Sequence, residues 1–331
     1  MRILVVGAIY GGTVPMGRAI YQAFNEIKLE ADFLDYADLQ KELLEIRSIR
    51  DEQKSYQFYL KVRIRLLERV SNFKPDVIFG VAQSPLNDSE MLQEFRKAGI
   101  RLCYWFMEDY RIFEYWRAIV PYFDHFFTIQ KGTFWDQLNR IGCNNYYYLP
   151  AAFDSNLECP VREKKPEISV SFVGAPYPNR IHFFGKLRRT DLQIYGEGWN
   201  KHPNSSVVVG DRRITESEAR DIYQRSVINI NLHSSPFPHT FEGGDFLNPR
   251  TFELAGLGAF QLTDMRKPLT LHFDPAEEVI SLNTWEDMER AIDYFLEHEA
   301  EREAIAEKAQ DLVLKKHTYK HRAEEVLSVL S

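Results

Sequence analysis

The sequence is short of cysteine, of long apolar runs and of positive charge. Its three cysteines, Cys103, Cys143 and Cys159, are odd in number and form no CxxC pair. That count argues against a disulfide framework and against a cysteine-rich zinc site. The apolar run at residues 3–7 falls far below the ~20 residues of a membrane span, and no basic segment with a cleavage site precedes it. We therefore expect a protein of a reducing, cytoplasmic compartment.

The charge balance and the glycine spacing disfavour two further classes of protein. Lys and Arg number 41 against 48 Asp and Glu, which gives a formal net charge of -7. A strongly basic nucleic-acid binder is thereby disfavoured, although a local basic cleft is still compatible with this balance. The dinucleotide spacing GxGxxG is absent, which disfavours a nicotinamide-dependent oxidoreductase. Aromatic residues are abundant (five Trp, 17 Tyr and 23 Phe), and they supply both cores and flat walls on which sugars and bases stack.

Short apolar strands alternate with helical patterns in the first half of the chain. Strands are expected at 2–7, 31–36, 75–80, 101–106 and 123–129. Helical patterns fall at 19–27, 39–72 and around 91–95. Continuous apolar strands in this alternation are typical of a parallel sheet covered on both faces.

The same alternation starts again after a polar, proline-bounded stretch at 154–166, which we interpret as a linker. Strands are expected at 168–174, 192–196, 227–232 and 259–263. Helices are expected at 178–188, 215–225 and 249–256. A further helix is expected to begin after a capping Thr284, and a last helical stretch is expected at 300–331 with a break near 317–319. The sequence therefore predicts an α/β protein of two halves with a cleft between them, where ligands sit beyond the carboxyl ends of the strands.

Two candidate motifs lie in the first half. Gly11 and Gly12 stand between a strand and a helix, where backbone N–H groups can meet an anion; the alternative is a plain packing turn. Glu108 and Asp109 follow the strand at 101–106. Adjacent carboxylates there can bind sugar hydroxyls or act as a base, and the alternative is helix capping with solvated charge.

The strand at 168–174 ends in a third candidate, Gly174-Ala-Pro-Tyr177-Pro-Asn-Arg180. Backbone amides, a helix N-terminus and a guanidinium together suit a diphosphate. The alternative places Arg180 on a solvated helix face.

The strand at 227–232 presents polar residues on one face. Alternation puts Asn229, Asn231 and His233 on the same side, where each needs a partner from a ligand or from neighbouring loops. A lone histidine is more often structural than catalytic.

A glycine-rich segment, Gly243-Gly-Asp245-Phe-Leu-Asn248, leads into the helix at 249–256. Asn248 suits an N-cap. Arg250 in the first turn opposes the helix dipole, and an anionic ligand would resolve that conflict. Glu253, one turn on, either pairs with Arg250 for ~0.2–0.5 kcal/mol or accepts from a ribose or sugar hydroxyl pair.

A family resemblance rests on motifs that occur in a fixed order along most of the chain. They are Tyr148-Leu-Pro-Ala-Ala-Phe-Asp154, Phe172-Val-Gly174-Ala-Pro-Tyr-Pro-Asn-Arg180, Ile194-Tyr-Gly-Glu-Gly-Trp199, Ile230-Asn-Leu-His233, Asn248-Pro-Arg-Thr-Phe-Glu253 with Gly258-Ala-Phe260, Phe273-Asp-Pro-Ala-Glu277-Glu-Val and His317-Thr-Tyr-Lys-His-Arg322. With these the chain resembles the CgeB-type, spore-maturation-protein-like branch of glycosyltransferases with the GT-B fold.

The resemblance implies two Rossmann-like domains facing across a cleft, with a C-terminal helix that crosses back to the first. Residues 1–160 would form the acceptor-side domain, 161–314 the nucleotide-sugar-binding domain, and 315–331 the returning helix. The implied activity is sugar transfer from a nucleotide-diphosphate sugar, with retention, to a glycan, a protein, a small molecule or a modified base. No tightly bound cofactor and no metal are implied.

The resemblance also implies an acid pair eight positions apart beside the donor. Glu253 would be the second acid and hold ribose, and Asp245 would be the first, where the family usually has Glu. The residues expected to bind the donor are Gly11, Gly12, Gly174, Tyr177, Arg180, Asn231, Asn248, Arg250, Thr251 and Glu253. The residues expected in catalysis are Asp109, Glu108, Asp245 and His233. Two alternatives stay open: a sugar-nucleotide epimerase, and a non-catalytic nucleotide-sugar-binding protein of the same fold.

Overall fold

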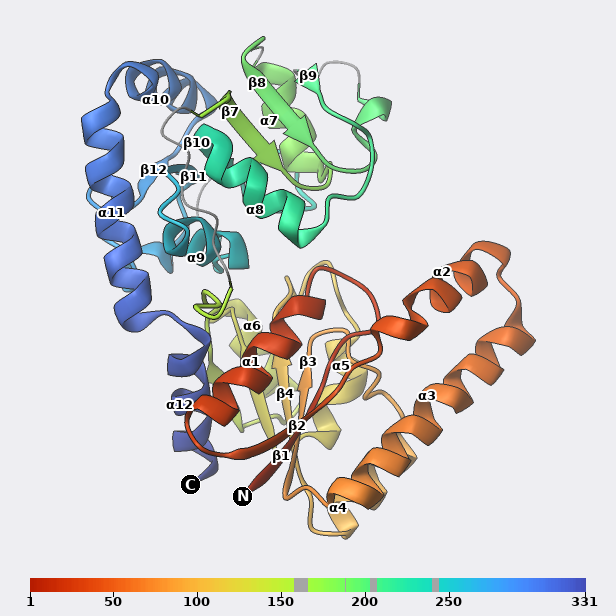
Figure 1. The fold of residues 1–331 in the computed structure, drawn as a ribbon. Coiled ribbons are helices and arrows are strands. Elements are labelled where there is room, and N and C mark those ends of the chain that lie inside the picture. Colours follow the sequence, from red (N-terminus) through yellow and green to blue (C-terminus); the bar gives the residue numbers. More distant parts are fainter. Residues whose placement is uncertain (158–165, 188, 203–206, 240–243) are drawn as a thin grey trace. The chain divides into compact units, whose positions relative to one another are not determined.

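The computed structural model describes residues 1–157, 166–187, 189–202, 207–239 and 244–331 (Figure 1). Cys159, Gly243 and most of the predicted linker 154–166 lie outside the described residues. The chain divides into two compact units, one of Met1–Pro150 with Tyr319–Ser331 and one of Ala151–Thr318. Among the helices in these ranges, none has both the length and the apolarity that a membrane span requires.

The first unit is built on a six-stranded parallel sheet in the order β2-β1-β3-β4-β5-β6. Its strands are β1 (Arg2–Val6), β2 (Glu30–Leu34), β3 (Val77–Val81), β4 (Arg101–Phe106), β5 (His125–Thr128) and β6 (Tyr146–Tyr148). The chain moves from β1 to one side and then returns to build the other side from β3. The carboxyl ends of β1 and β3 therefore form the switch point at which open α/β sheets bind ligands.

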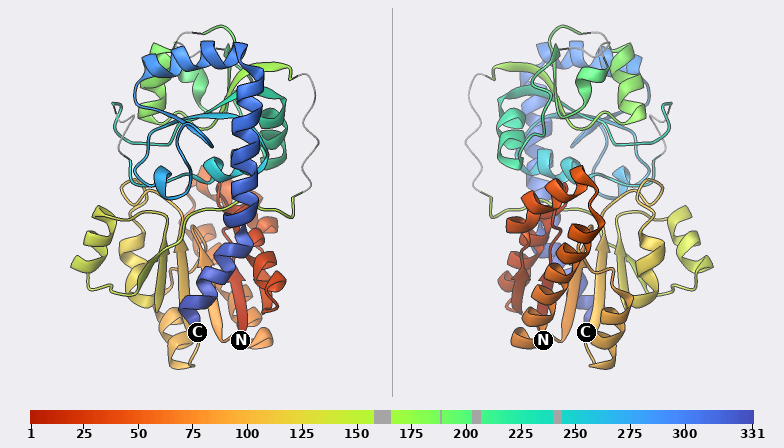
Figure 2. Two further views of the ribbon diagram at one scale, coloured as in Figure 1. Left: turned by 90° about the vertical axis from the view of Figure 1, so that its left-hand side faces the viewer. Right: turned by 90° about the vertical axis from the view of Figure 1, so that its right-hand side faces the viewer.

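Helices cover both faces of this sheet (Figure 2). They are α1 (Val14–Glu26), α2 (Gln40–Ile49), α3 (Glu52–Phe73), α4 (Ser89–Lys97), α5 (Trp116–Ile119), α6 (Thr133–Arg140) and α12 (Tyr319–Leu330), with short 3-10 turns η1 (Ala37–Leu39) and η2 (Val120–Tyr122). The single helical stretch predicted at 39–72 is two helices. The chain turns between them because Arg50 is left-handed, with φ 52°, and Asp51 caps α3 by accepting from the Lys54 N–H.

The C-terminal helix α12 is part of the first unit and packs beside α1 (Figures 1 and 2). The buried Arg322 donates from Nε to the Pro150 carbonyl at 2.9 Å. At the far end of the helix, Arg101 Nη1 donates to the Leu330 carbonyl at 2.5 Å. Two guanidinium groups thus anchor the helix to the end of β6 and the start of β4.

The second unit repeats the architecture with the order β12-β11-β10-β7-β8-β9, again all parallel. Its strands are β7 (Ile168–Val173), β8 (Leu192–Tyr195), β9 (Val207–Val208), β10 (Ser226–Asn231), β11 (Gln261–Asp264) and β12 (Ile280–Leu282). Its helices are α7 (Pro178–Lys186), α8 (Glu216–Arg225), α9 (Pro249–Gly256), α10 (Trp285–Glu297) and α11 (Glu299–Lys316), with η3 (Trp199–Lys201) and η4 (Leu269–Leu271). The strand order reverses between β7 and β10, which is the switch point of this unit.

Local signals explain where several elements begin and end. Thr284 accepts from the Asp287 N–H and starts α10 at the predicted position. The predicted break near 317–319 is confirmed, because Thr318 pairs with Phe153 as an isolated bridge and the Phe153 N–H donates to the His317 carbonyl at 2.9 Å. The predicted α/β class with two parallel sheets is likewise confirmed.

Candidate functional site

Gly174 follows β7 at the carboxyl end of the strand and lies close to neighbouring side chains. A Cβ added to Gly174 would lie 3.0 Å from the Phe172 ring and 3.1 Å from Arg180 Nη1. The Gly174 carbonyl accepts from Trp199 Nε1 at 2.6 Å. The following turn leads into α7, which has Tyr177 at the N-cap and a proline in its first turn. This glycine therefore lets the guanidinium of Arg180 approach the end of the strand.

Arg180 ties the loop after β7 to the loop after β10. Its Nε and Nη2 donate to the Leu232 carbonyl at 3.0 and 2.7 Å, and its Nη1 donates to the Ala175 carbonyl at 3.1 Å. The alternative of a solvated helix face is wrong, because the side chain is buried under the rings of Phe172 and Tyr177. Burial, with help from the nearby Arg250, lowers the pKa of Arg180 to about 9, so the group is still cationic at neutral pH. Its contact with a diphosphate stays a prediction.

The asparagines of β10 find their partners inside the unit. Asn231 donates from Nδ2 to Thr251 Oγ1 and Gln261 Oε1, both at 3.0 Å, and accepts from Asn248 Nδ2 at 2.8 Å. Asn248 is the N-cap of α9, since its Oδ1 accepts from the Thr251 N–H at 3.0 Å and from Thr251 Oγ1 at 3.1 Å. The capping interpretation of Asn248 is thereby confirmed. Asn231, Asn248 and Thr251 form one network that fixes the start of α9 against β10.

Arg250 is half-buried in the first turn of α9 and only partly satisfied. Its Nε donates to the Tyr223 hydroxyl at 2.7 Å. Its Nη1 is buried and has no hydrogen-bond partner among the described residues. Burial raises the pKa of Tyr223 to about 12, so this hydroxyl holds the guanidinium without carrying charge. A buried donor left without a partner costs ~1–3 kcal/mol, and such a group in a native protein calls for an explanation.

Glu253 lies one turn further on α9. Within the described residues it forms no hydrogen bond or ion pair through its carboxylate, so the proposed pair with Arg250 is not made. Burial raises the pKa of Glu253 to about 7, and the charge of Arg250 offsets this effect only in part. A half-buried carboxylate with free oxygens is therefore poised between its two protonation states near neutral pH.

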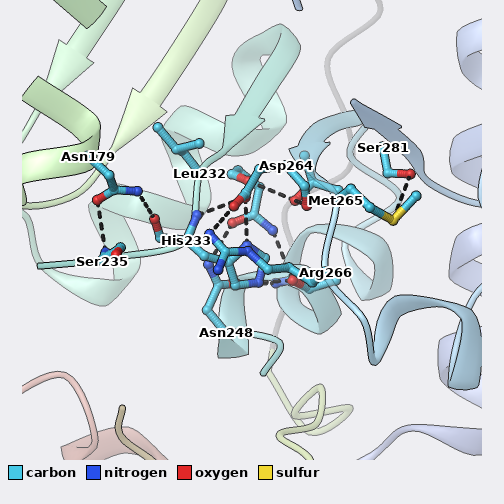
Figure 3. Close-up of polar contacts among 12 residues, drawn as sticks. Asn179, Leu232, His233, Ser235, Asn248, Asp264, Met265, Arg266 and Ser281 are labelled. Carbon is cyan, nitrogen blue, oxygen red and sulfur yellow. Dashed lines mark hydrogen bonds and ion pairs between the residues drawn. The ribbon is translucent and has the colours of Figure 1, made fainter. Parts of the chain in front are cut away.

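His233 follows β10 and is bound to an aspartate that the sequence analysis did not single out (Figure 3). The His233 N–H and Nδ1 contact Asp264 Oδ1 at 2.9 and 2.8 Å, and Arg266 pairs with Oδ2 of the same carboxylate. Burial lowers the pKa of His233 to about 4, so the imidazole is neutral. Burial alone would raise the pKa of Asp264, but Arg266 and His233 bring it down to about 2. Asp264 could have been identified from the sequence as a carboxylate at the end of an apolar parallel strand.

Asp245 directly follows Gly244, whose backbone contacts the Asp264 cluster at Arg266. The backbone of Gly244 pairs with Arg266 in an isolated bridge, and the Lys267 N–H donates to the Gly244 carbonyl at 2.9 Å. Asp245 is half-buried beside it. The roles of Asp245 and His233 in catalysis stay predictions.

The first unit places a second cluster at the carboxyl ends of β1, β3 and β4. Glu108 is buried, and it accepts from the Tyr115 hydroxyl at 2.6 Å and from Gln83 Nε2. Burial raises the pKa of Glu108. A Cβ on Gly11 would lie 2.2 Å from Gln83 Oε1, whereas Gly12 has open space around it. Gln83 is itself left-handed, with φ 65°, a conformation that costs a non-glycine residue ~1–3 kcal/mol. Sequence analysis missed Gln83 and Tyr115.

Asp109 differs from its neighbour Glu108. Its carboxylate accepts from the Arg111 N–H and Nε at 3.0 and 2.9 Å, from Arg111 Nη2 at 3.2 Å and from Gln130 Nε2 at 3.4 Å. These donors come from its own loop and from the end of β5, so they fix the loop after β4.

Comparison with known proteins adds independent information. The family model described as glycosyl transferase-like matches residues 159–328, half of the chain. Spore protein CgeB of Bacillus subtilis is 22% identical over 266 residues, which cover 76% of this chain and 81% of CgeB. The predicted CgeB-type resemblance is confirmed by these two matches.

Among solved structures, HepE of Anabaena in complex with UDP-glucose has a TM-score of 0.65 at 10% identity, covering 99% of this chain and 98% of HepE. Sucrose-phosphate synthase from Thermosynechococcus elongatus has a TM-score of 0.65 at 9% identity, covering 99% of this chain and 97% of that one. At such identities the likeness establishes the fold. The chain therefore belongs to the glycosyl transferase-like family, as a CgeB-type member with the GT-B fold of two Rossmann-like units.

Proposed function

We propose that this protein transfers a sugar, with retention, from a nucleotide-diphosphate sugar held by the second unit to a hydroxyl acceptor contacted by the first. The observation that carries the donor assignment is the buried Nη1 of Arg250, which has no partner among the described residues. A diphosphate oxygen would satisfy this donor with a charge-assisted hydrogen bond. It would also remove the conflict between a cation and the positive end of the α9 dipole.

The neighbours of Arg250 suit the rest of a nucleotide sugar. Glu253 lies one turn further along the same helix, and its carboxylate oxygens have no hydrogen-bond partner in the part of the chain that the structure describes, so they can accept from the two ribose hydroxyls. Arg180 and the N-terminus of α7 supply further positive potential at the adjoining strand end. The complex of HepE with UDP-glucose makes UDP-glucose the first donor to test.

The reaction can be written with this chain's own groups. The acceptor oxygen bonds to C1 of the sugar as the bond between C1 and the β-phosphate oxygen breaks. The electron pair leaves with the nucleoside diphosphate, and the acceptor proton ends on that phosphate. Arg250 and Arg180 stabilise the charge that builds on the leaving group, because preorganised cations act on charge that develops in the transition state. Glu108 orients the acceptor hydroxyl by accepting its hydrogen bond, and Asp245 and His233 are the residues of the second unit that we assign to the sugar.

The donor assignment is tested by calorimetry with UDP-glucose. Arg250→Ala removes the unpartnered donor, and we expect a loss of ~1–3 kcal/mol in binding free energy, roughly a tenfold to hundredfold weaker affinity. Arg290→Ala on α10 is the control, because that side chain is 72% exposed and pairs with the neighbouring Asp287. An unchanged affinity in the Arg250 variant rejects the assignment.

Product analysis separates transfer from its two alternatives. Incubation with UDP-glucose alone should give slow release of UDP and glucose, as water replaces the acceptor. An epimerised nucleotide sugar would indicate an epimerase. Binding without any turnover, in the presence of a range of hydroxyl acceptors, would indicate a non-catalytic binding protein.

A further inference from the structure

Two buried polar atoms on the side chains that bind Asp264 have no hydrogen-bond partner among the described residues. They are Nε2 of His233 and Nε of Arg266. His233 is fully buried and Arg266 is 2% exposed, and Figure 3 shows both side chains around the Asp264 carboxylate. A buried polar atom without a partner is uncommon in a native protein, and it indicates that a ligand or a water completes the site.

The two atoms differ in what they need. Burial alone would raise the pKa of Asp264, but Arg266 and His233 bring it down to about 2, so this carboxylate is ionised at neutral pH and can only accept. The Nδ1 atom of His233 therefore donates to it, and burial keeps the ring neutral by lowering its pKa to about 4. Nε2 then carries a lone pair and needs a donor, whereas the guanidinium Nε of Arg266 carries a hydrogen and needs an acceptor.

This combination of one acceptor and one donor distinguishes among ligand chemistries. The diphosphate of a nucleotide sugar has only acceptor oxygens near neutral pH, so it would satisfy Arg266 and leave His233 unpaired. An ammonium group would satisfy His233 alone and would be repelled by the neighbouring guanidinium. A hydroxyl group both donates and accepts. A sugar ring, which carries several hydroxyls side by side, can therefore satisfy both atoms without adding charge.

The segment around Asp245 contacts the same two side chains. The backbone of Gly244 pairs with Arg266 in an isolated bridge. The Phe246 ring lies edge-on to the His233 ring with centroids 5.6 Å apart, and its centroid is 6.0 Å from Arg266 Cζ. Asp245 stands between these two contacts. Its backbone is therefore fixed beside the atoms that need a hydroxyl.

The cluster also lies close to the proposed diphosphate site. Asn231, the last residue of β10, precedes His233 by two residues. It accepts from Asn248 Nδ2 at 2.8 Å, and Asn248 is the N-cap of the helix whose first turn carries Arg250. A diphosphate bound by Arg250 is bonded directly to its sugar. It would therefore hold the sugar near the carboxyl end of β10, where His233 lies.

We propose that His233 and Arg266 bind hydroxyl groups of the transferred sugar and determine which sugar is accepted. One hydroxyl donates to Nε2 of His233, and the oxygen of the same or a neighbouring hydroxyl accepts from Nε of Arg266. Asp264 is the positioning residue, because it fixes the tautomer of the imidazole and the place of the guanidinium. The proposal rests on the proposed transferase function and names the residues that recognise its sugar. A donor without the hydroxyl at His233 leaves a buried acceptor unpaired and is disfavoured.

The wild-type protein is tested first, by calorimetry with UDP-glucose and its analogues. In each analogue one hydroxyl of the glucose, at C2, C3, C4 or C6, is replaced by hydrogen or by fluorine. Replacement by hydrogen should weaken binding at least tenfold at one of these positions. Fluorine cannot donate, so the fluoro analogue at that position should not regain the affinity of UDP-glucose. Equal affinities for UDP-glucose and all four deoxy analogues, or full recovery with fluorine, overturn the proposal.

A variant then assigns the loss to His233. In a folded His233→Leu protein the affinity for UDP-glucose should fall at least tenfold, whereas the affinity for UDP should stay unchanged. The deoxy analogue that discriminates in the wild type should bind this variant as well as UDP-glucose does. His298→Leu is the matched control, because His298 is exposed at the end of α10 and should keep the wild-type pattern. Equal losses for UDP and UDP-glucose in His233→Leu overturn the proposal, and the analogue series on the wild type decides it should that variant not fold.

Binding of UDP separates this inference from the function on which it rests. If neither UDP nor UDP-glucose binds, the proposed donor site is overturned and the inference falls with it. If both bind and every analogue binds like UDP-glucose, the donor site stands and the assignment of His233 and Arg266 to the sugar is overturned alone.

Discussion

Asp264 holds His233 by two hydrogen bonds to one oxygen, from the His233 N–H at 2.9 Å and from Nδ1 at 2.8 Å. Both side chains are fully buried. With Nδ1 donating, the imidazole is the tautomer whose Nε2 is an acceptor, and this atom has no partner among the described residues. The pair therefore fixes the loop after β10 and leaves a neutral, buried ring whose protonation would be costly.

The pH dependence of stability should reveal this burial. The pKa of His233 is lowered from 6.5 to about 4, so the unfolded chain binds more protons than the folded chain between these values. Through His233, the free energy of unfolding should therefore lose about 3 kcal/mol as the pH is lowered from 6.5 to 4. His233→Gln removes this contribution. The contribution of His233 is measured by urea unfolding across this pH range, as the difference in the free energy of unfolding between the variant and the wild type.

His298→Gln is the control for that experiment, because His298 is exposed at the end of α10. Its stability profile should run parallel to that of the wild type. If the His233→Gln profile also runs parallel to that of the wild type, the assignment of the acid sensitivity to His233 is rejected.

Glu253 should impose a pH dependence on donor binding. Burial raises its pKa to about 7, and the ionised form is the one that accepts from ribose hydroxyls without donating a proton. UDP-glucose has no group that titrates between pH 6 and 8. Its affinity should therefore rise by up to about tenfold across this range, as Glu253 loses its proton.

Calorimetry at several pH values compares the wild type with Glu253→Gln. The variant should bind more weakly at pH 8 and show no rise. Glu299→Gln, an exposed change in the first turn of α11, should keep the full rise. A pH profile that survives in Glu253→Gln would remove Glu253 from the donor site.

The glycine before Asp245 is expected to be essential for the Asp264 cluster. A Cβ at Gly244 would lie 1.8 Å from Arg266 Nη1 and 2.7 Å from its Cδ, so Gly244→Ala must displace the guanidinium. Separating Arg266 from the buried Asp264 leaves an uncompensated charge, a change that typically costs ~3–5 kcal/mol. Gly185→Ala in α7 is the control, because a Cβ there meets no atom within 4 Å among the residues that the structure describes and alanine favours a helix by up to ~1 kcal/mol. Thermal unfolding of both variants measures the contrast, and equal midpoints would contradict it.

Much of this fold could be predicted from the sequence because parallel strands are continuous apolar runs. The strands from β1 to β5 and β7, β8, β10 and β11 were all expected close to their observed positions. The short elements were missed, among them β6, β9 and β12, because two or three residues carry too little periodicity. The turn at Arg50 was missed for another reason, since a left-handed φ on a residue other than glycine has no local signature.

For the candidate site, too, local features could be predicted from the sequence, whereas contacts between residues far apart in the chain could not. Alternation along β10 placed Asn231 and His233 on one face, and the capping role of Asn248 followed from its position before a proline. The partner of His233 lies 31 residues away, and the pairing depends on β10 and β11 being neighbours. Strand order is a tertiary property, so no local pattern could link His233 to Asp264. The burial of Arg180 was missed because its partners are backbone carbonyls, which look the same in every sequence.

The last prediction concerns Gly11 and Gly12, the two adjacent glycines after β1, where each variant serves as the control for the other. Gly11 has φ +122° and a Cβ there would lie 2.2 Å from Gln83 Oε1, so Gly11→Ala strains the backbone and displaces the side chain that donates to Glu108. The Cβ of Gly12→Ala meets no atom of the described residues within 4 Å. We expect the first change to lower the unfolding midpoint and the second to leave it unchanged. If the backbone at Gly12 approaches the donor, Gly12→Ala should weaken UDP-glucose binding at unchanged stability, because only a glycine permits so close an approach. Calorimetry on Gly12→Ala that shows wild-type affinity would remove Gly12 from the donor site.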